Sequence, residues 1–292
     1  METVVKTEKD GTVTAAVTVP QTALTPPKEG GVPLVEIPGQ SIPTGGSGTG
    51  EGSTAIAVDL PGALDTPVIV AIPVTDGTVV LRGDGTPVAL SLVEDGKAYV
   101  VLEASEELRI VTAGDFFDDV EGAAKAAADF GAARALWTGT GEREFSPEMI
   151  MNRAMLATVL WRLNGAEDPN GLELFPDVPP EAWFASAAAW GGETGVVQGT
   201  GAGFAPDVAL TAEQMLVMLY RYTTYADLLV PVADDTGAGA PEGTSSWAAE
   251  AVAWAINAGL VRPGEDGDLT APITRAQAAE IMRGYVGYLV RR

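Results

Sequence analysis

Short runs of β-branched and apolar residues, alternating with polar ones, occupy the first 113 residues of the chain. Such runs predict strands, because successive side chains of a strand point to opposite faces of a sheet. Asp-Gly pairs separate several runs, and Asp-Gly tolerates the positive φ angles of tight hairpin turns. We therefore expect a small antiparallel sandwich or meander, with strands near residues 12–19, 54–60, 67–73, 78–81, 87–93, 98–103 and 108–112.

Residues 44–53, with the sequence TGGSGTGEGS, interrupt this pattern. Glycine and serine dominate the stretch, which is typical of a flexible linker. It has no lysine beside its glycines, so it does not match a phosphate-binding loop. We expect residues 1–53 to form an extended β segment with this linker and residues 54–113 to form a small antiparallel β domain.

From residue 114 the pattern becomes helical and repeats about every sixty residues, which predicts three related units at 114–170, 171–229 and 230–292. Each repeat predicts two helices. The first has aromatic residues seven positions apart on one face, as in Trp183 with Trp190 and Trp247 with Trp254. The chain is therefore predicted to be an α+β multidomain protein, with an all-β part followed by an all-α part.

The second helix of each repeat begins at a capping residue. Thr211 with Gln214 and Thr274 with Gln277 have the spacing of capping boxes, and Asn152 caps the first repeat. Arg153 and Arg275 then hold the first helical position, where the second repeat has Ala212.

An arginine at a helix start faces the positive end of the helix dipole, which costs about 0.3–1 kcal/mol at an exposed site. One explanation is an anion site, because free amides at a helix start and a guanidinium both favour a carboxylate. The alternative is an intramolecular pair with Asp119 or Asp234 of a neighbouring repeat.

Composition narrows the functions further. The chain has 17 Lys and Arg against 40 Asp and Glu, for a net charge of −23, so nucleic acid is not an expected partner. It contains neither histidine nor cysteine, which excludes thiol chemistry and a Ser-His-Asp hydrolase. No apolar run approaches the roughly 20 residues of a membrane span. The acidic pairs Asp234-Asp235 and Asp266/Asp268 lack the spacing of a calcium loop, so no metal or cofactor is expected.

The order F-x-D-V, a Trp-led helix ending in glycine, G-T-G-x-x-F-x-P and a helix opening with I-T-R-A-Q resembles the S-layer homology module. The resemblance covers three copies, from about residue 115 to residue 292. It implies a pseudo-threefold helical unit whose intermodule grooves bind secondary cell-wall polysaccharide, often with a pyruvate ketal. It further implies a non-catalytic anchor at the extracellular cell wall, with upstream domains of a longer parent protein.

The resemblance also implies roles for individual residues. Arg153 and Arg275 would grip the ligand carboxylate, beside the cap residues of the three repeats. Tryptophans at the start of the first helix would lie against a sugar face, and loop glycines would let the backbone approach the ligand. The implied site residues are Arg153, Arg275, Asn152, Thr211, Thr274, Asp119, Asp177, Asp234, Trp183, Trp247, Gly139 and Gly199.

No repeat is complete. Ala212 replaces the arginine of the second repeat, Ala123 replaces the tryptophan of the first, and Pro263 replaces the loop glycine of the third. We therefore expect fewer than three working grooves, and we expect binding to fail in the middle groove, at Ala212.

Two other functions remain open. One is a structural or protein-interaction module whose sugar grooves are vestigial, which Ala212 and Ala123 favour. The other is a carboxylate-based glycosidase, for which no sequence pattern marks an acid and nucleophile pair.

Overall fold

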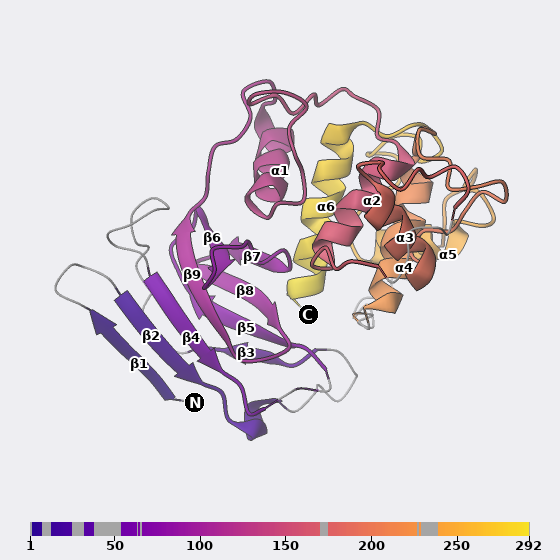
Figure 1. Cartoon of the computed structure of the whole chain (residues 1–292). Coiled ribbons are helices and arrows are strands. Elements are labelled where there is room, and N and C mark those ends of the chain that lie inside the picture. Colours follow the sequence, from indigo (N-terminus) through magenta and orange to yellow (C-terminus); the bar gives the residue numbers. More distant parts are fainter. Residues whose placement is uncertain are drawn as a thin grey trace. The chain divides into compact units, whose positions relative to one another are not determined.

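The computed structural model describes residues 2–7, 13–24, 32–37, 54–62, 64, 66–169, 175–226, 228 and 239–291. The chain divides into two compact units, one of residues 1–115 with 286–292 and the other of residues 116–285. The described strands belong to the first unit, and helices α1 to α5 belong to the second (Figure 1). The prediction of a mixed α+β protein is confirmed. The predicted linker at 44–53 lies outside the described residues.

The first unit contains two sheets that share one hydrophobic core. Val17, Ile56 and Leu108 from one sheet and Val70 and Val100 from the other are almost completely buried in it. The five-stranded sheet has the order β1 (Glu2–Thr7), β2 (Val13–Thr18), β4 (Thr54–Asp59), β9 (Glu106–Thr112) and β6 (Thr78–Arg82). The four-stranded sheet has the order β3 (Leu34–Glu36), β5 (Val68–Pro73), β8 (Lys97–Leu102) and β7 (Ser91–Glu94), and a 3-10 turn (Gln21–Leu24) precedes β3.

The purely antiparallel arrangement expected from the sequence is wrong for two strand pairs. β2 pairs with β4 in parallel, and so does β3 with β5. Parallel neighbours need a crossover connection, and here the chain passes through β3 of the other sheet on its way from β2 to β4. Asp95 and Gly96 both have positive φ and join β7 to β8 as a tight hairpin, whereas Gly77 connects β5 and β6 of different sheets.

The second unit consists of helix pairs at the places that the repeats predict. The helices are α1 (Gly122–Ala133), α2 (Arg153–Leu163), α3 (Ala185–Thr194), α4 (Ala212–Tyr225), α5 (Ala249–Asn257) and α6 (Arg275–Val290). The second helix of one repeat packs against the first helix of the next, as α2 does on α3 and α4 on α5. No helix in the described part of the chain is long and apolar enough to cross a lipid bilayer.

The predicted caps are confirmed. The Asn152 side chain accepts a hydrogen bond from the Met155 amide, and Thr211 and Gln214 exchange both bonds of a capping box. Thr274 and Gln277 do the same at the start of α6. These caps fix the start of each second helix. They therefore also fix the position of the helix-start residue, which is Arg153, Ala212 or Arg275.

Three buried residues, one before each cap, form a closed ring of backbone hydrogen bonds. The Met151 amide donates to the Ile273 carbonyl at 2.9 Å, and the Ile273 amide donates to the Leu210 carbonyl at 2.9 Å. The Leu210 amide then donates to the Met151 carbonyl at 2.8 Å. Because the ring links segments far apart in sequence, each second helix begins next to a different repeat.

Candidate functional site

Arg153 occupies the first position of α2 and is 7% exposed. Its Nε donates to the Phe204 carbonyl at 2.9 Å, and its Nη2 donates to the Gln198 carbonyl at 2.7 Å. Both carbonyls belong to the loop between the two helices of the second repeat. The guanidinium therefore bridges two points of a loop that belongs to the neighbouring repeat.

Arg275 makes the same contacts at the start of α6. It is 6% exposed, and its Nε and Nη2 donate to the Phe145 carbonyl at 2.7 Å and the Thr138 carbonyl at 3.0 Å. These carbonyls belong to the loop of the first repeat, and the guanidinium lies 4.5 Å from the Phe145 ring. Burial lowers the pKa of both Arg153 and Arg275 below the usual arginine range.

Among the described residues, the hydrogen bonds of the helix-start arginines go to backbone carbonyls and not to an aspartate, the partner that one of the two sequence-based explanations expected. Each guanidinium is held inside the protein by backbone carbonyls, while Asp119 lies close enough to Arg275 to act on it electrostatically. Asp234, the other expected partner, lies outside the described residues. Within the described part of the chain, the hydrogen bonds of each arginine use Nε and Nη2, so Nη1 can donate to a further acceptor.

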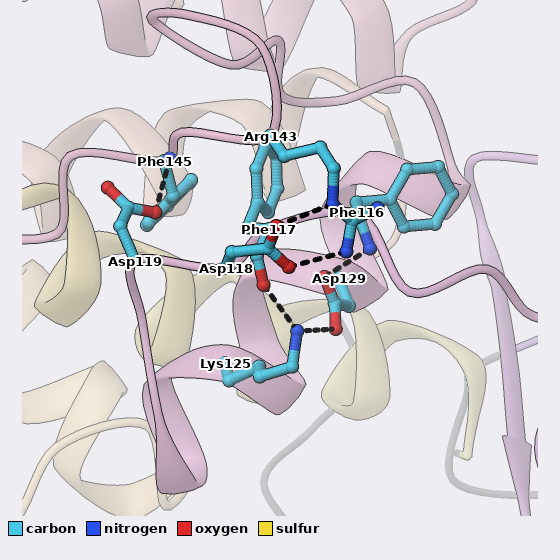
Figure 2. A network of polar contacts seen from close by, with 8 residues as sticks. All are labelled: Phe116, Phe117, Asp118, Asp119, Lys125, Asp129, Arg143 and Phe145. Atoms are coloured by element: carbon cyan, nitrogen blue, oxygen red, sulfur yellow. Dashed lines mark hydrogen bonds and ion pairs between the residues drawn. The ribbon is translucent and has the colours of Figure 1, made fainter.

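Asp119 and Asp177 hold the same two loops from within their own repeats. Asp119 accepts from the amides of Phe145 and Ser146, both at 2.7 Å, and the first of these bonds is visible in Figure 2. Asp177 accepts from the amides of Phe204 and Ala205, both at 2.7 Å. The carboxylates stabilise a backbone turn in which Ser146 and Ala205 have positive φ angles.

The pKa of each of these aspartates lies below its ordinary value. For Asp119, burial raises the pKa, but the amides of Phe145 and Ser146 and the charge of Arg275 contribute to a larger combined lowering. For Asp177, the Phe204 amide is the largest cause of the lowered pKa, with Ala205 adding to it. Both side chains therefore act as ionised loop supports.

A further network of charges stabilises the beginning of the first repeat (Figure 2). Arg143 pairs with Asp118 through two nitrogen–oxygen contacts of 2.6 and 2.7 Å. Lys125 pairs with Asp129 at 3.0 Å and also donates to the Phe117 carbonyl. This network stands in the repeat that lacks the tryptophan, and the sequence analysis did not predict it.

Gly139 and Gly199 allow the loops to fold back on themselves. A Cβ atom on Gly139 would lie 2.8 Å from the Glu144 carbonyl oxygen, and one on Gly199 would lie 2.9 Å from the Gly203 carbonyl oxygen. Such distances are shorter than ordinary contacts, so another residue would displace the backbone. The close approach at these glycines is to the loop's own backbone.

A groove of about 220 Å³ lies between three repeats and brings several predicted residues together. Gly139 comes from the first repeat, Trp183 from the second and Arg275 from the third. Trp183 is 63% exposed, so its ring is available to a ligand. The described lining residues are Leu136, Trp137, Thr138, Gly139, Thr140, Met155, Thr158, Val159, Arg162, Trp183 and Arg275, and no acid is among them.

Arg162, near the end of α2, is the groove residue that sequence reasoning missed. Its Nη1 donates to the Leu136 carbonyl at 3.2 Å, and it also lines an adjoining hollow of about 500 Å³ together with Arg143. A sequence signal was available, because Arg221 stands at the corresponding place in the second repeat.

The other predicted residues lie apart from this lining. Asn152, Thr211 and Thr274 hold the helix starts through their caps. Trp247 is 57% exposed and lies just before α5, the first helix of the third repeat. In the third loop, Asp266 and Asp268 accept hydrogen bonds from the nearby Arg262 and Thr270 amides, and Asp235 lies outside the described residues.

Comparison with known proteins gives a family match for part of the helical unit. Residues 174–216 match the S-layer homology domain, a family that indicates attachment of secreted proteins to the bacterial cell wall. An amylopullulanase of Thermoanaerobacterium thermosulfurigenes is 29% identical over 159 residues, which are 52% of this chain and 8% of that protein. The exoglucanase XynX of Acetivibrio thermocellus is 30% identical over 160 residues, which are 52% of this chain and 14% of that protein. The matches therefore cover a small part of each enzyme.

Proposed function

We propose that the helical part of the chain is a non-catalytic anchor that binds secondary cell-wall polysaccharide at the bacterial surface. Its modules would be residues 114–170, 171–229 and 230–292, arranged with pseudo-threefold symmetry. The ring formed by Met151, Leu210 and Ile273 supports this arrangement, because each amide donates in the same manner to the preceding repeat, and the first repeat donates to the third. Residues 1–53 and 54–113 would then connect the anchor to the other domains of a longer secreted protein.

The observation that carries the proposal is the charge of the groove. Acids outnumber bases by 40 to 17 in the chain, yet the described groove residues include Arg162 and Arg275 and no acid. Arginines in a strongly acidic protein create a local field that attracts an anion against the global charge. The exposed ring of Trp183 adds an apolar face on which a sugar can lie.

We propose that the ligand is an acidic saccharide whose carboxylate, such as that of a pyruvate ketal, meets the arginines. A guanidinium can donate two parallel hydrogen bonds to a carboxylate, which makes arginine better suited than lysine to this role. The groove volume of about 220 Å³ suits a short saccharide segment.

Co-sedimentation with purified cell-wall sacculi tests the proposal. The intact chain should sediment with sacculi that retain their polysaccharide and remain in solution with sacculi stripped of it. Trp183→Ala should weaken retention while preserving the fold, because the side chain is largely exposed. Arg275→Ala is a less clean variant, since Arg275 also holds the first loop. Equal sedimentation with stripped and intact sacculi would contradict the proposal.

The second candidate is a structural or protein-interaction module with vestigial grooves. Ala212 and Ala123 favour it, because each removes a side chain that the groove needs. It predicts that the chain shows no retention on sacculi even when their polysaccharide is intact.

A further inference from the structure

Each second helix has a recurring position nine residues after its first residue. It is Arg162 in α2, Arg221 in α4 and Gly284 in α6. An α-helix turns by about 100° per residue, so nine residues correspond to about 180°. The helix-start residue and the position-nine residue therefore point to opposite sides of their helix. A helix between two grooves can thus supply one side chain to each.

The structure pairs these positions across repeats. Arg275 of the third repeat and Arg162 of the first line the same groove. Arg153 of the first repeat lies close enough to Arg221 of the second for that positive charge to lower the Arg153 pKa, after the larger effect of burial. The first groove, which contains the loop of the first repeat, is therefore built from the helix start of the third repeat and position nine of the first. By the same order, the second groove would combine Arg153, which holds the second loop, with Arg221.

The two arginines of each pair differ in how many of their guanidinium nitrogens already donate a hydrogen bond within the protein. Arg153 and Arg275 each use two nitrogens to hold loop carbonyls. Arg162 gives one hydrogen bond to a carbonyl, and Arg221 makes neither a hydrogen bond nor an ion pair within the described part of the chain. Both are half-buried, and burial lowers the pKa of each. A half-buried cation without an acidic partner is costly unless an anion meets it.

The third groove would combine the loop of the third repeat with the helix start of the second. The Glu213 amide donates to the Leu269 carbonyl, just as Ala154 and Ala276 donate to the other two loops. Ala212 therefore stands against the third loop. The position-nine residue of that groove is Gly284, and the nearest arginine, Arg283, is rotated about 100° around the helix and acts on Arg134 at the end of α1.

The remaining departures fall in the same groove. In the first groove the tryptophan comes from the following repeat, as Trp183 shows. If each groove takes this position from the repeat that follows its loop, Trp247 belongs to the second groove and Ala123 to the third. Pro263 also replaces the loop glycine of the third groove. The missing side chains are spread over three repeats in the sequence. In space, two grooves would keep both arginines, the tryptophan and the loop glycine, and the third groove would lack all four.

We propose, on the basis of the function proposed above, that Arg162 and Arg221 contact the anionic group of the saccharide in two separate grooves, and that the third groove takes none. The shared chemistry is a sugar carboxylate held by a pair of guanidinium groups. The helix-start arginines position the loops and supply the second cation. The chain then binds two acidic saccharide units.

The six tryptophans offer a readout for each groove separately. The full chain would be labelled with 5-fluorotryptophan, its fluorine resonances assigned by single Trp→Phe variants, and titrated with a methyl hexoside that carries a pyruvate ketal. The same hexoside without the ketal is the neutral control. Trp183 and Trp247 should respond to the ketal probe, and calorimetry should give two sites per chain.

Single substitutions then test the pairing. Arg162→Gln should weaken the probe affinity reported by Trp183 about tenfold or more, because it removes one charge-assisted contact. The affinity reported by Trp247 should stay unchanged. Arg221→Gln should have the opposite effect. Arg283→Gln is the matched control, because it removes an exposed arginine next to position nine and should change neither. The unaffected tryptophan reports that each variant is folded.

The outcomes separate the two proposals. If the intact chain binds intact sacculi and the ketal probe but both responses survive Arg162→Gln and Arg221→Gln, the arginine pairing is wrong and the anchoring function stands. Three sites per chain would equally overturn the pairing. If the intact chain binds neither sacculi nor probe, the anchoring function fails, and the pairing fails with it.

Discussion

Asp119 and Arg275 hold the same residue, Phe145, from opposite ends. The Asp119 carboxylate accepts from the Phe145 amide, and the Arg275 guanidinium donates to the Phe145 carbonyl, both at 2.7 Å. Asp177 and Arg153 hold Phe204 in the same way. The Asp of one repeat and the Arg of another thus fix a groove loop between them, so loop shape and repeat packing depend on each other.

Replacing a helix-start arginine should destabilise the helical unit even in the absence of ligand. Arg153→Gln and Arg275→Gln each remove one buried bond, to the carbonyl of Phe204 or Phe145, and one part-buried bond, to the carbonyl of Gln198 or Thr138. The loss should cost about 2–4 kcal/mol, because the buried acceptor is left unsatisfied. Thermal unfolding followed by circular dichroism measures the change. Arg283→Gln is the control for an exposed arginine, and an equal melting temperature for all three variants would show that the loop contacts do not contribute.

Asp177→Asn should lower stability by about 1 kcal/mol, because a neutral amide accepts more weakly than a carboxylate from the Phe204 and Ala205 amides and the side chain is exposed. Denaturant unfolding measures the difference. Asp207→Asn removes an exposed acid of the same repeat for which no hydrogen bond is found among the described residues, and it should have little effect. If both variants unfold at the same denaturant concentration, the loop carboxylate is not a support.

Acid should reduce the stability that Asp119 and Asp177 give to the loops of the first and second repeats. The pKa values of Asp119 and Asp177 lie below the ordinary 3.8 in the folded protein. Their contribution is therefore fully present above the unfolded pKa and is lost as pH falls from about 4 through the lower folded values. Stability curves between pH 5 and pH 2 should show a steeper fall for the wild type than for the Asp119→Asn and Asp177→Asn double variant. Parallel curves would contradict this.

Gly139→Ala and Gly199→Ala should distort their loops, because the new Cβ atoms would lie 2.8 and 2.9 Å from carbonyl oxygens. We expect a loss of about 1–3 kcal/mol for each, as in other overpacked sites. Gly239→Ala is the matched control, since its Cβ would meet no atom within 4 Å. Chemical denaturation compares the three, and a stability for Gly139→Ala equal to that of Gly239→Ala would show that the loop adapts freely.

The sequence predicted local features well where short-range chemistry determines them. Thr211 with Gln214 and Thr274 with Gln277 form their capping boxes because the bonding groups lie within one helical turn. Alternation located most of the strands but missed β1 and β3, and it did not predict the parallel pairing of β2 with β4. Pairing partners depend on the path of the chain between strands, which alternation along a single strand does not encode.

The sequence by itself determined that helix pairs repeat, that Arg153 and Arg275 stand at helix starts, and that each repeat lacks one expected group. Only the tertiary structure decided what those arginines touch, because their partners Phe204 and Phe145 lie 51 and 130 residues away along the chain. It also shows that one groove draws residues from three repeats, with Gly139, Trp183 and Arg275 on a common surface. The physical reason is the closed ring at Met151, Leu210 and Ile273, which directs each second helix toward a neighbouring repeat. Side chains that are separated in sequence therefore act together, and a residue missing from one repeat is missing from the groove of another.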